Sequence, residues 1–202
     1  MSVYKINDLF SKEELEIFYG LINSIVIPIK DDGTYIYDTD ESPGNCTISQ
    51  SLGRLQSTFR PPEKIQKKLI NTAKNIESKE LIISSMTYVE YNKKYGTPNL
   101  PPHFDGDGSD VIINYQISSN TSWDIGLGTE IHKIEDNSAL VFNPNKNIHW
   151  RPYKTFNEDE YVKMIFFRLM GPGPIEDNSH LRYSLDNKIY KEANMVRESL
   201  AS

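Results

Sequence analysis

The sequence has little cysteine, no long apolar run and no excess of basic residues. Cys46 is the only cysteine in 202 residues, which excludes an intramolecular disulfide and a zinc site built from several thiolates. No apolar window of about 18 residues occurs, so no transmembrane helix is predicted. The charges in the first apolar stretch are unlike those of a secretory signal. We therefore expect no membrane association, a reducing compartment and a cytoplasmic location.

The charge balance argues against a nucleic-acid partner. The chain has 22 basic and 28 acidic residues, which gives a net charge of -6. A surface that follows a phosphate backbone normally carries a basic excess. The length predicts one domain, residues 1–202, with a core that needs no disulfide. The sequence does not indicate which oligomeric state the protein has.

The first 80 residues carry helical signals. Ser11 and Glu14 form a capping box before apolar residues at helical spacing, which predicts a helix over residues 12–24 after a short strand, "VYKI". The stretch "PPEKIQKKLINTAKNI" predicts a second helix. Residues 30–60 contain turn signals and no sustained period, so we expect irregular structure with short strands that could cover a site.

From residue 81 onward the pattern changes to short strands bounded by Gly, Pro, Asn or Asp. Seven such segments run from "LIISSMTYVEY" to "YVKMIFFRLM". They predict an α+β, mainly β, fold: a helical part over residues 1–80, packed on one face of a β-sandwich core over residues 81–171. Residues 172–202 read as a polar tail that ends in a short helix.

The segment "NLPPHFDGDGSD", residues 99–110, allows three interpretations: a calcium loop, a solvated turn, or part of a transition-metal site. Counted from Asp105, the sixth residue is Asp110, where a calcium loop of the EF-hand type needs glycine, and the twelfth is Gln116, where it needs glutamate. The calcium interpretation is therefore disfavoured. A solvated turn remains the ordinary interpretation of a single His-x-Asp pair.

The positions of three residues, His103, Asp105 and His149, favour the metal interpretation. His103 and Asp105 are two residues apart, so their side chains share a face if this piece is extended. His149 follows the strand "ALVFNP" and a turn, where a sandwich strand could return beside the first pair. Two imidazoles and one carboxylate make a facial triad that suits Fe(II), although affinity alone does not exclude other divalent metals.

Three segments together carry a family resemblance: "TYVEYNKKYGTPNLPPHFDG", "SALVFNPNKNIHW" and "YVKMIFFRLM". They resemble the iron(II)- and 2-oxoglutarate-dependent oxygenases of the prolyl-4-hydroxylase-like branch, over residues 3–25 and 83–170. The resemblance implies a double-stranded β-helix of the jelly-roll, cupin-like type. It also implies Fe(II) on His103, Asp105 and His149, 2-oxoglutarate as co-substrate, O2 as oxidant, and hydroxylation of a peptidyl (prolyl-like) or small-molecule substrate.

The resemblance is incomplete where the co-substrate should be anchored. The family usually places Arg or Lys about ten residues after the second histidine, but this chain has the acidic "NEDE" there. Lys163, on the final strand, is the first candidate for a carboxylate anchor, and Arg168 is the second. Tyr91 matches the family tyrosine that hydrogen-bonds the co-substrate. Asn114 is a candidate pocket residue.

Other residues and two rival functions complete the expectations. Arg54 and Arg151 are candidate contacts for an anionic substrate, whereas His132 and His180 read as residues outside the site. One rival is a non-catalytic jelly-roll binding module, which the displaced anchor favours slightly. The other is a cupin-like metal enzyme that does not use 2-oxoglutarate.

Overall fold

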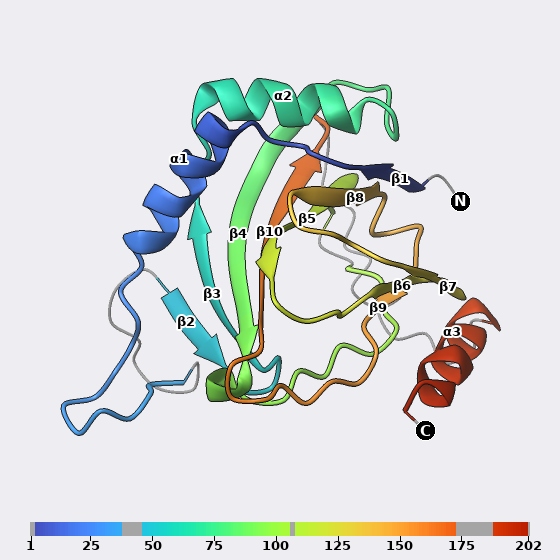
Figure 1. Cartoon of the computed structure of the whole chain (residues 1–202). Helices are drawn as coiled ribbons and strands as arrows, with labels where there is room; N and C mark the ends of the chain where they lie inside the picture. The colour runs from blue at the N-terminus through green and yellow to red at the C-terminus, as the bar shows by residue number, and fades with distance from the viewer. Residues whose placement is uncertain (1–2, 38–45, 106–107, 173–187, 202) are drawn as a thin grey trace.

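The computed structural model describes residues 3–37, 46–105, 108–172 and 188–201, and these form two facing antiparallel sheets with helices outside them (Figure 1). The larger sheet has the order β1-β8-β5-β10-β4-β3-β2 and the smaller one β7-β6-β9. In that order, the strands of the larger sheet are Val3–Ile6, Ser138–Phe142, Val111–Ser119, Tyr161–Met170, Ile82–Asn92, Arg54–Phe59 and Cys46–Ser49, and those of the smaller sheet are Glu130–His132, Ile125–Leu127 and His149–Trp150. This is the predicted α+β, mainly β, double-stranded β-helix.

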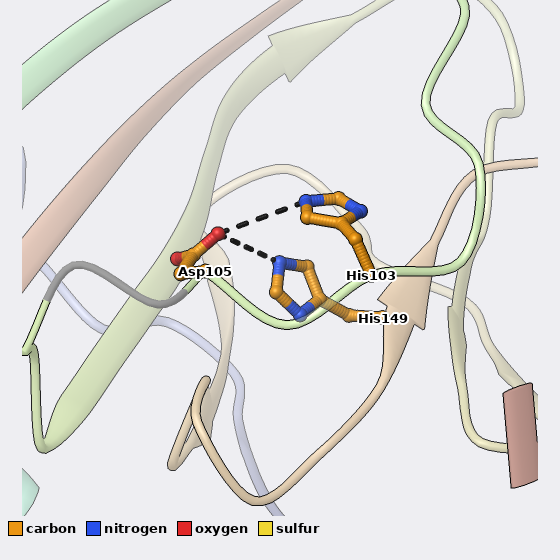
Figure 2. A group of neighbouring side chains, drawn as sticks. All are labelled: His103, Asp105 and His149. Atoms are coloured by element: carbon orange, nitrogen blue, oxygen red, sulfur yellow. Dashed lines mark hydrogen bonds and ion pairs between the residues drawn. The ribbon is translucent and has the colours of Figure 1, made fainter. Parts of the chain in front are cut away.

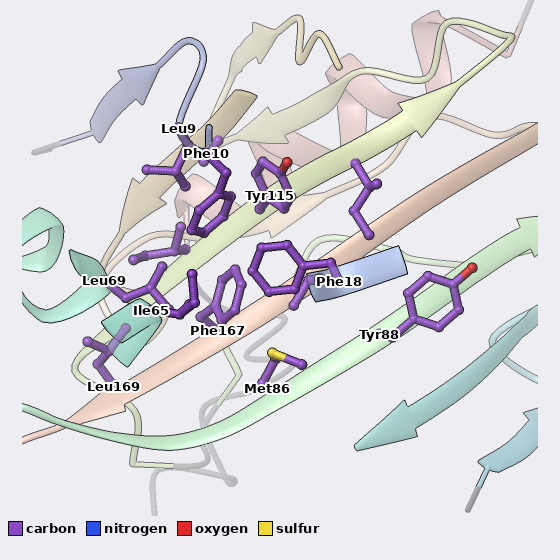
Figure 3. Close-up of a cluster of buried hydrophobic side chains, with 14 of the residues drawn as sticks. Leu9, Phe10, Phe18, Ile65, Leu69, Met86, Tyr88, Tyr115, Phe167 and Leu169 are labelled. Carbon is purple, nitrogen blue, oxygen red and sulfur yellow. The ribbon is translucent and has the colours of Figure 1, made fainter. Parts of the chain in front are cut away.

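The helices α1 (Lys12–Asn23) and α2 (Glu63–Ala73) cover the outer face of the larger sheet (Figure 1). Phe18 of α1 meets Phe167 of β10 at a ring-centroid distance of 6.0 Å, and both side chains are fully buried (Figure 3). Ile65 and Leu69 of α2 join the same cluster. The predicted packing of the N-terminal helices on one face of the sheet is confirmed.

Alternation along the central strands divides the larger sheet into an outer and an inner face. On β10, Ile165 and Phe167 pack into the outer cluster below the helices, whereas Val162 and Met164 pack into a second cluster between the two sheets. Strand register extends the inner face to the neighbouring strands. The inner cross-strand pairs are Val162 with Tyr91, Phe166 with Asn114, and Arg168 with Ile112.

The predicted helical part, residues 1–80, contributes strands as well as helices, in line with the short strands expected at "VYKI" and within residues 30–60. Residues 1–80 contain three strands, β1, β2 and β3, which extend the larger sheet at its two edges. Residues 46–59 therefore belong mostly to the sheet instead of forming an irregular cover, while residues 38–45 of the suggested cover lie outside the described part of the chain. The one-turn 3-10 helix η1 (Lys93–Tyr95) follows β4.

The C-terminal helix α3 (Lys188–Ser199) packs beside the smaller sheet (Figure 1). Its Ala193 is buried in a small cluster with Ile148 and Trp150. The predicted terminal helix is confirmed, but one of its faces is buried, so it is not simply a polar tail. Among the described helices, none has both the length and the apolar character that crossing a bilayer requires.

Candidate metal centre and pocket

His103, Asp105 and His149 converge between the two sheets (Figure 2). One potential ligand atom from each lies within 4.8 Å of the others. The side chains of His103, Asp105 and His149 are 11%, 8% and 11% exposed, respectively. They form a shielded cluster, which a solvated turn would not provide.

Backbone pairing places the three side chains. His103 and His149 exchange two backbone hydrogen bonds, each 3.0 Å long, and so form an isolated antiparallel bridge. Asp105 lies two residues beyond His103, and its amide donates to the Pro144 carbonyl at 3.3 Å. The strand return predicted after "ALVFNP" is therefore present, and it brings the distant imidazole to the His-x-Asp pair.

The two imidazoles direct the same nitrogen towards Asp105. His103 Nδ1 lies 2.7 Å from the Pro101 carbonyl, and His149 Nδ1 lies 3.2 Å from the Asn147 carbonyl. If both Nδ1 atoms donate, both Nε2 atoms present lone pairs. These Nε2 atoms lie 3.6 Å and 3.2 Å from Asp105 Oδ1. Because the lone pairs of the three atoms would repel one another, a cation or a proton is needed among them. Carbonyl-oriented imidazoles of this kind are typical of metal ligands.

Asp105 has a second oxygen that also fits a cation site. Oδ2 is buried and accepts no hydrogen bond within the described part of the chain, and Arg168 Nη2 lies 3.8 Å from it. Burial raises the pKa of Asp105, but His149 and His103 in their protonated forms, together with Arg168, outweigh this effect and hold the pKa below its ordinary value. The carboxylate is therefore ionised, as a metal ligand must be.

The triad lies in a pocket that also contains predicted co-substrate residues. Tyr91, Asn114 and Arg168 line this pocket together with the triad. Asn114 is 5% exposed, and its Oδ1 has no hydrogen-bond partner among the residues described. A buried amide oxygen without a partner is costly, so a ligand or water donor is expected there.

Lys163 requires a correction, because the structure does not bring it to the pocket. It pairs across the sheet with Glu90, and its Nζ lies 4.0 Å from Glu90 Oε2. Its side chain shares the outer face with Ile165 and Phe167, whereas the pocket lies on the inner face. Strand β10 is apolar on both faces, so hydrophobicity alone did not identify the face that borders the pocket.

Arg151, which the sequence offers only as a candidate contact for an anionic substrate, belongs to the buried part of the pocket lining. It lines the pocket and is 4% exposed. It donates to the Trp123 carbonyl, lies 4.9 Å from the Trp123 ring centroid, and places Nη2 3.0 Å from the Met164 sulfur. Burial lowers the pKa of Arg151 to about 10, so it remains a cation at neutral pH. Its spacing of two residues from His149 was the available signal, because alternation places both on one side of an extended segment.

The other candidates are placed as follows. Arg54 lines the pocket, and its Nη1 donates to the Tyr91 hydroxyl at 3.0 Å. His132 lies outside the triad, with Nε2 3.6 Å from Glu130 Oε2. His180 lies outside the described residues.

Comparisons with known proteins give structural matches alone. No family model and no curated protein matches the chain. The α-ketoglutarate-dependent carbocyclase SnoK from nogalamycin biosynthesis is 12% identical, with a TM-score of 0.59 over 93% of this chain and 90% of that one. HygX from Streptomyces hygroscopicus, with nickel and 2-oxoglutarate bound, is 10% identical, with a TM-score of 0.54 over 86% and 84% of the two chains. A Pseudomonas putida prolyl-4-hydroxylase is 7% identical, with a TM-score of 0.53 over 85% and 93%.

The chain has the fold of the 2-oxoglutarate- and iron(II)-dependent oxygenases. At these identities the likeness concerns the fold, and it agrees with the resemblance that the three sequence segments carry. Within this oxygenase fold, the larger and smaller sheets enclose the His-Asp-His cluster and its pocket. The activity has to be argued from the side chains themselves.

Proposed function

We propose that this protein is an iron(II)- and 2-oxoglutarate-dependent oxygenase that hydroxylates a peptidyl, prolyl-like or small-molecule substrate. The observation that carries the proposal is the convergence of two imidazoles and one ionised carboxylate in a shielded pocket of this fold. Three protein ligands of this kind leave positions open for a co-substrate and dioxygen. The chain also offers no competing thiolate there, since Cys46 belongs to the outer hydrophobic cluster.

His103, Asp105 and His149 would hold the metal ion. Neutral imidazoles and a hard carboxylate suit Fe(II), and the carbonyl contacts of both Nδ1 atoms keep the Nε2 atoms available. When bound, iron(II) with 2-oxoglutarate and O2 supplies oxidation of a C–H bond to C–OH, while 2-oxoglutarate is converted to succinate and carbon dioxide. The protein contributes ligand geometry, substrate orientation and exclusion of water.

Arg151, instead of Lys163, is our candidate for the anchor of the distal carboxylate of 2-oxoglutarate. A buried guanidinium that contacts a carbonyl, a sulfur atom and an indole ring gains much from a carboxylate partner. Arg151 follows His149 by two residues, about 6.6 Å along an extended chain, a separation that suits the two ends of a five-carbon diacid. A dicarboxylate could then reach the metal and the arginine together.

Tyr91 would be the second contact of that carboxylate. Its hydroxyl accepts a hydrogen bond from Arg54, so its own proton is available for a ligand oxygen. Arg168, beside Asp105, and Asn114, with its unpartnered oxygen, would border the metal-proximal part of the co-substrate. These roles follow from placement in the pocket, and each can be tested by a separate variant.

The reaction outcome, hydroxylation, is proposed from the chemistry of the pocket, because similar folds carry different activities. The matched structures are named as a carbocyclase and as a prolyl-4-hydroxylase, among others. Hydroxylation needs no further protein group beyond the metal ligands and a bound substrate, so it is our proposal for this pocket. We also propose a cytoplasmic location, which the buried free thiol of Cys46 supports.

The test is an anaerobic titration of the protein with Fe(II) and then 2-oxoglutarate, followed by visible absorption. The proposal expects the weak charge-transfer band of the chelate, and its loss in His149→Ala. Arg151→Met should weaken 2-oxoglutarate binding at least tenfold, whereas Lys163→Met, outside the pocket, should change it by less than about twofold. Aerobic conversion of 2-oxoglutarate to succinate is the second readout.

Each rival function has a distinct result in this experiment. Metal binding without the chelate band would favour a cupin-like enzyme that does not use 2-oxoglutarate. Absence of metal binding in the folded wild-type protein would favour a binding module and would overturn the proposal. A band that survives in His149→Ala would exclude the assigned ligand set.

A further inference from the structure

The pocket is rich in positive charge within an acidic protein. Arg54, Arg151 and Arg168 line it, and Asp105 is the one acidic residue among the described residues that do so. Three guanidinium groups less one carboxylate leave an excess of two positive charges, although the whole chain carries -6. A divalent metal ion and dianionic 2-oxoglutarate would cancel each other. The positive excess would therefore remain when both are bound.

The three arginines have different surroundings. Arg168 lies beside Asp105, so these two charges offset each other. Arg151 is 4% exposed, and we assign it to the co-substrate. Arg54 is only partly buried and contacts Gln56, Tyr91 and the Phe166 ring, none of which is acidic. Arg54 is therefore the cation with access to a second ligand.

Arg54 is held in place before any ligand arrives. Its Nε donates to Gln56 Oε1 at 3.1 Å, its Nη1 donates to the Tyr91 hydroxyl at 3.0 Å, and its Cζ lies 5.7 Å from the Phe166 ring centroid. These contacts fix the plane of the guanidinium without neutralising its charge. A preorganised arginine loses less conformational entropy when it binds an anion.

The backbone before Arg54 is fixed as well. Gly53 has a φ of +59°, in the left-handed region, and a Cβ at this position would lie 2.4 Å from the Pro98 nitrogen. The turn therefore rests directly on the segment that leads to His103. This close contact sets the position of Arg54 relative to the proposed metal site. Phe166, whose ring lies beside the Arg54 guanidinium, adds an apolar side chain to the pocket lining, as do Leu52 and Leu100.

We propose that the primary substrate of this pocket carries an anionic group, a carboxylate or a phosphate, on an apolar body, and that Arg54 binds this group. The inference rests on the proposed oxygenase function, because it assigns Arg151 and the metal to 2-oxoglutarate. The planar guanidinium suits the paired oxygens of either anion. The apolar residues beside Arg54 would contact the body of the substrate, whose C–H bond faces the metal.

The experiment uses the protein loaded with Ni(II) and saturating 2-oxoglutarate under anaerobic conditions, so that no turnover occurs. Binding of phenylacetate, phenyl phosphate and the neutral phenylacetamide is measured by ligand-observed NMR with full titrations. We expect at least one of the two acids to bind, and phenylacetamide to bind at least tenfold more weakly. Which acid binds better distinguishes a carboxylate site from a phosphate site.

Two substitutions at Arg54 and one matched control test the assignment. Arg54→Gln should weaken binding of the acids about tenfold, and Arg54→Lys less, because it keeps the charge but loses the planar fork. Lys163→Gln removes the same charge outside the pocket and should change acid binding by less than twofold. In each variant, 2-oxoglutarate affinity is measured separately by titration of the Ni(II)-loaded protein.

Several outcomes would overturn the inference while leaving the proposed function intact. These are equal binding of the amide and the acids, no binding of either acid at millimolar concentration, or a loss in Arg54→Gln that falls mainly on 2-oxoglutarate. The last result would place Arg54 in the co-substrate site. Failure of wild-type protein to bind Ni(II) and 2-oxoglutarate would instead be a failure of the proposed function.

Discussion

The Trp150 indole lies directly on the backbone of Gly126, next to the proposed ligand His149. A Cβ at residue 126 would lie 2.0 Å from the Trp150 ring, and Trp150 Nε1 donates to the Gly128 carbonyl at 2.9 Å. Both residues are in strands of the smaller sheet that pair with each other. The absence of a side chain at Gly126 therefore sets the position of the segment that carries His149.

Gly126→Ala should destabilise the protein by about 1–3 kcal/mol, because the ring or the strand has to move. It should also weaken metal binding about tenfold, as expected when the support of a ligand is disturbed. Urea unfolding and metal titration measure the two effects. Gly20→Ala is the control: beyond the adjacent residues and the α1 backbone, nothing lies within 4 Å of a Cβ added at Gly20, and this change should stabilise the protein by about 0.5–1 kcal/mol. Equal metal affinity in wild type and Gly126→Ala would contradict the positional role.

The proposed metal ligands could be predicted from the sequence, whereas the proposed anchor of 2-oxoglutarate could not. The sequence could predict the three proposed metal ligands, because a two-residue spacing and a returning strand indicate that His103, Asp105 and His149 converge. The placement of Lys163 could not be predicted in this way, because the face of β10 that borders the pocket depends on the register of β10 with β4 and β5. The hydrophobic pattern of β10 does not indicate which face borders the pocket, because both faces are buried: Val162 lies on one face and Ile165 on the other. The two-residue spacing of Arg151 from His149 suggests that both side chains lie on one side, but only the tertiary structure shows that Arg151 is buried in the pocket lining.

At the scale of the elements, the start of α1 is linked to α2 through one carboxylate. Glu14 accepts from the Ser11 amide at 2.9 Å, and the Glu14 amide donates to Ser11 Oγ at 3.3 Å, which completes the predicted capping box. The same carboxylate pairs with Lys68 at 2.6 Å. Its side chain is 7% exposed, so the cap and the helix–helix contact share a buried charge.

Glu14→Gln should therefore cost about 1–2 kcal/mol of unfolding free energy, measured with urea at neutral pH. Burial alone would raise the pKa of Glu14, but Lys68 and the Ser11 amide outweigh it, so the pKa is lowered. A lowered folded pKa contributes stability above the unfolded pKa, about 4.3, and this stability is lost as the pH falls through the folded pKa. The difference between wild type and variant should shrink over that range.

The exposed Glu16, in the same helix, is the matched control for this prediction. Glu16→Gln removes the same charge from the same helix without a buried partner and should change stability by less than about 0.5 kcal/mol. A difference between wild type and Glu14→Gln that stays constant down to acidic pH would show that the carboxylate charge is not what stabilises this junction.

At the scale of the whole molecule, α3 supports the strand that carries the proposed site. Arg197 is 2% exposed, and its Nε donates to the Arg151 carbonyl at 2.9 Å. Its Nη2 donates to Asn99 Oδ1 at 3.0 Å, and its Cζ lies 3.7 Å from the Tyr153 ring centroid. The far end of the chain thus contacts the segments before His103 and after His149.

Arg197→Met should destabilise the protein by about 2–4 kcal/mol, since it removes buried charge-assisted hydrogen bonds. It should also weaken 2-oxoglutarate binding, because the Arg151 backbone loses a partner. Met195→Gln, at a side chain that is 64% exposed in the same helix, should leave both properties nearly unchanged. Unfolding in urea and titration with the co-substrate measure the pair. If Arg197→Met lowers stability but leaves 2-oxoglutarate affinity unchanged, the support of Arg151 is excluded.

A metal ion shared by His103, Asp105 and His149 would connect segments that are 44 residues apart in sequence and so stabilise the fold as a whole. At a free metal concentration of 100 times Kd, binding to the folded state adds about 2.7 kcal/mol, which for a chain of this size raises Tm by about 5–10 °C. Co(II), which is stable in air, is a suitable probe in a thermal unfolding experiment. His149→Ala should abolish the rise, whereas His132→Ala should keep it, because His132 is outside the cluster. Loss of a single ligand should weaken a shared site enough to remove the stabilisation at that metal concentration. A rise in Tm that persists in His149→Ala would therefore mean that the three side chains do not bind one ion.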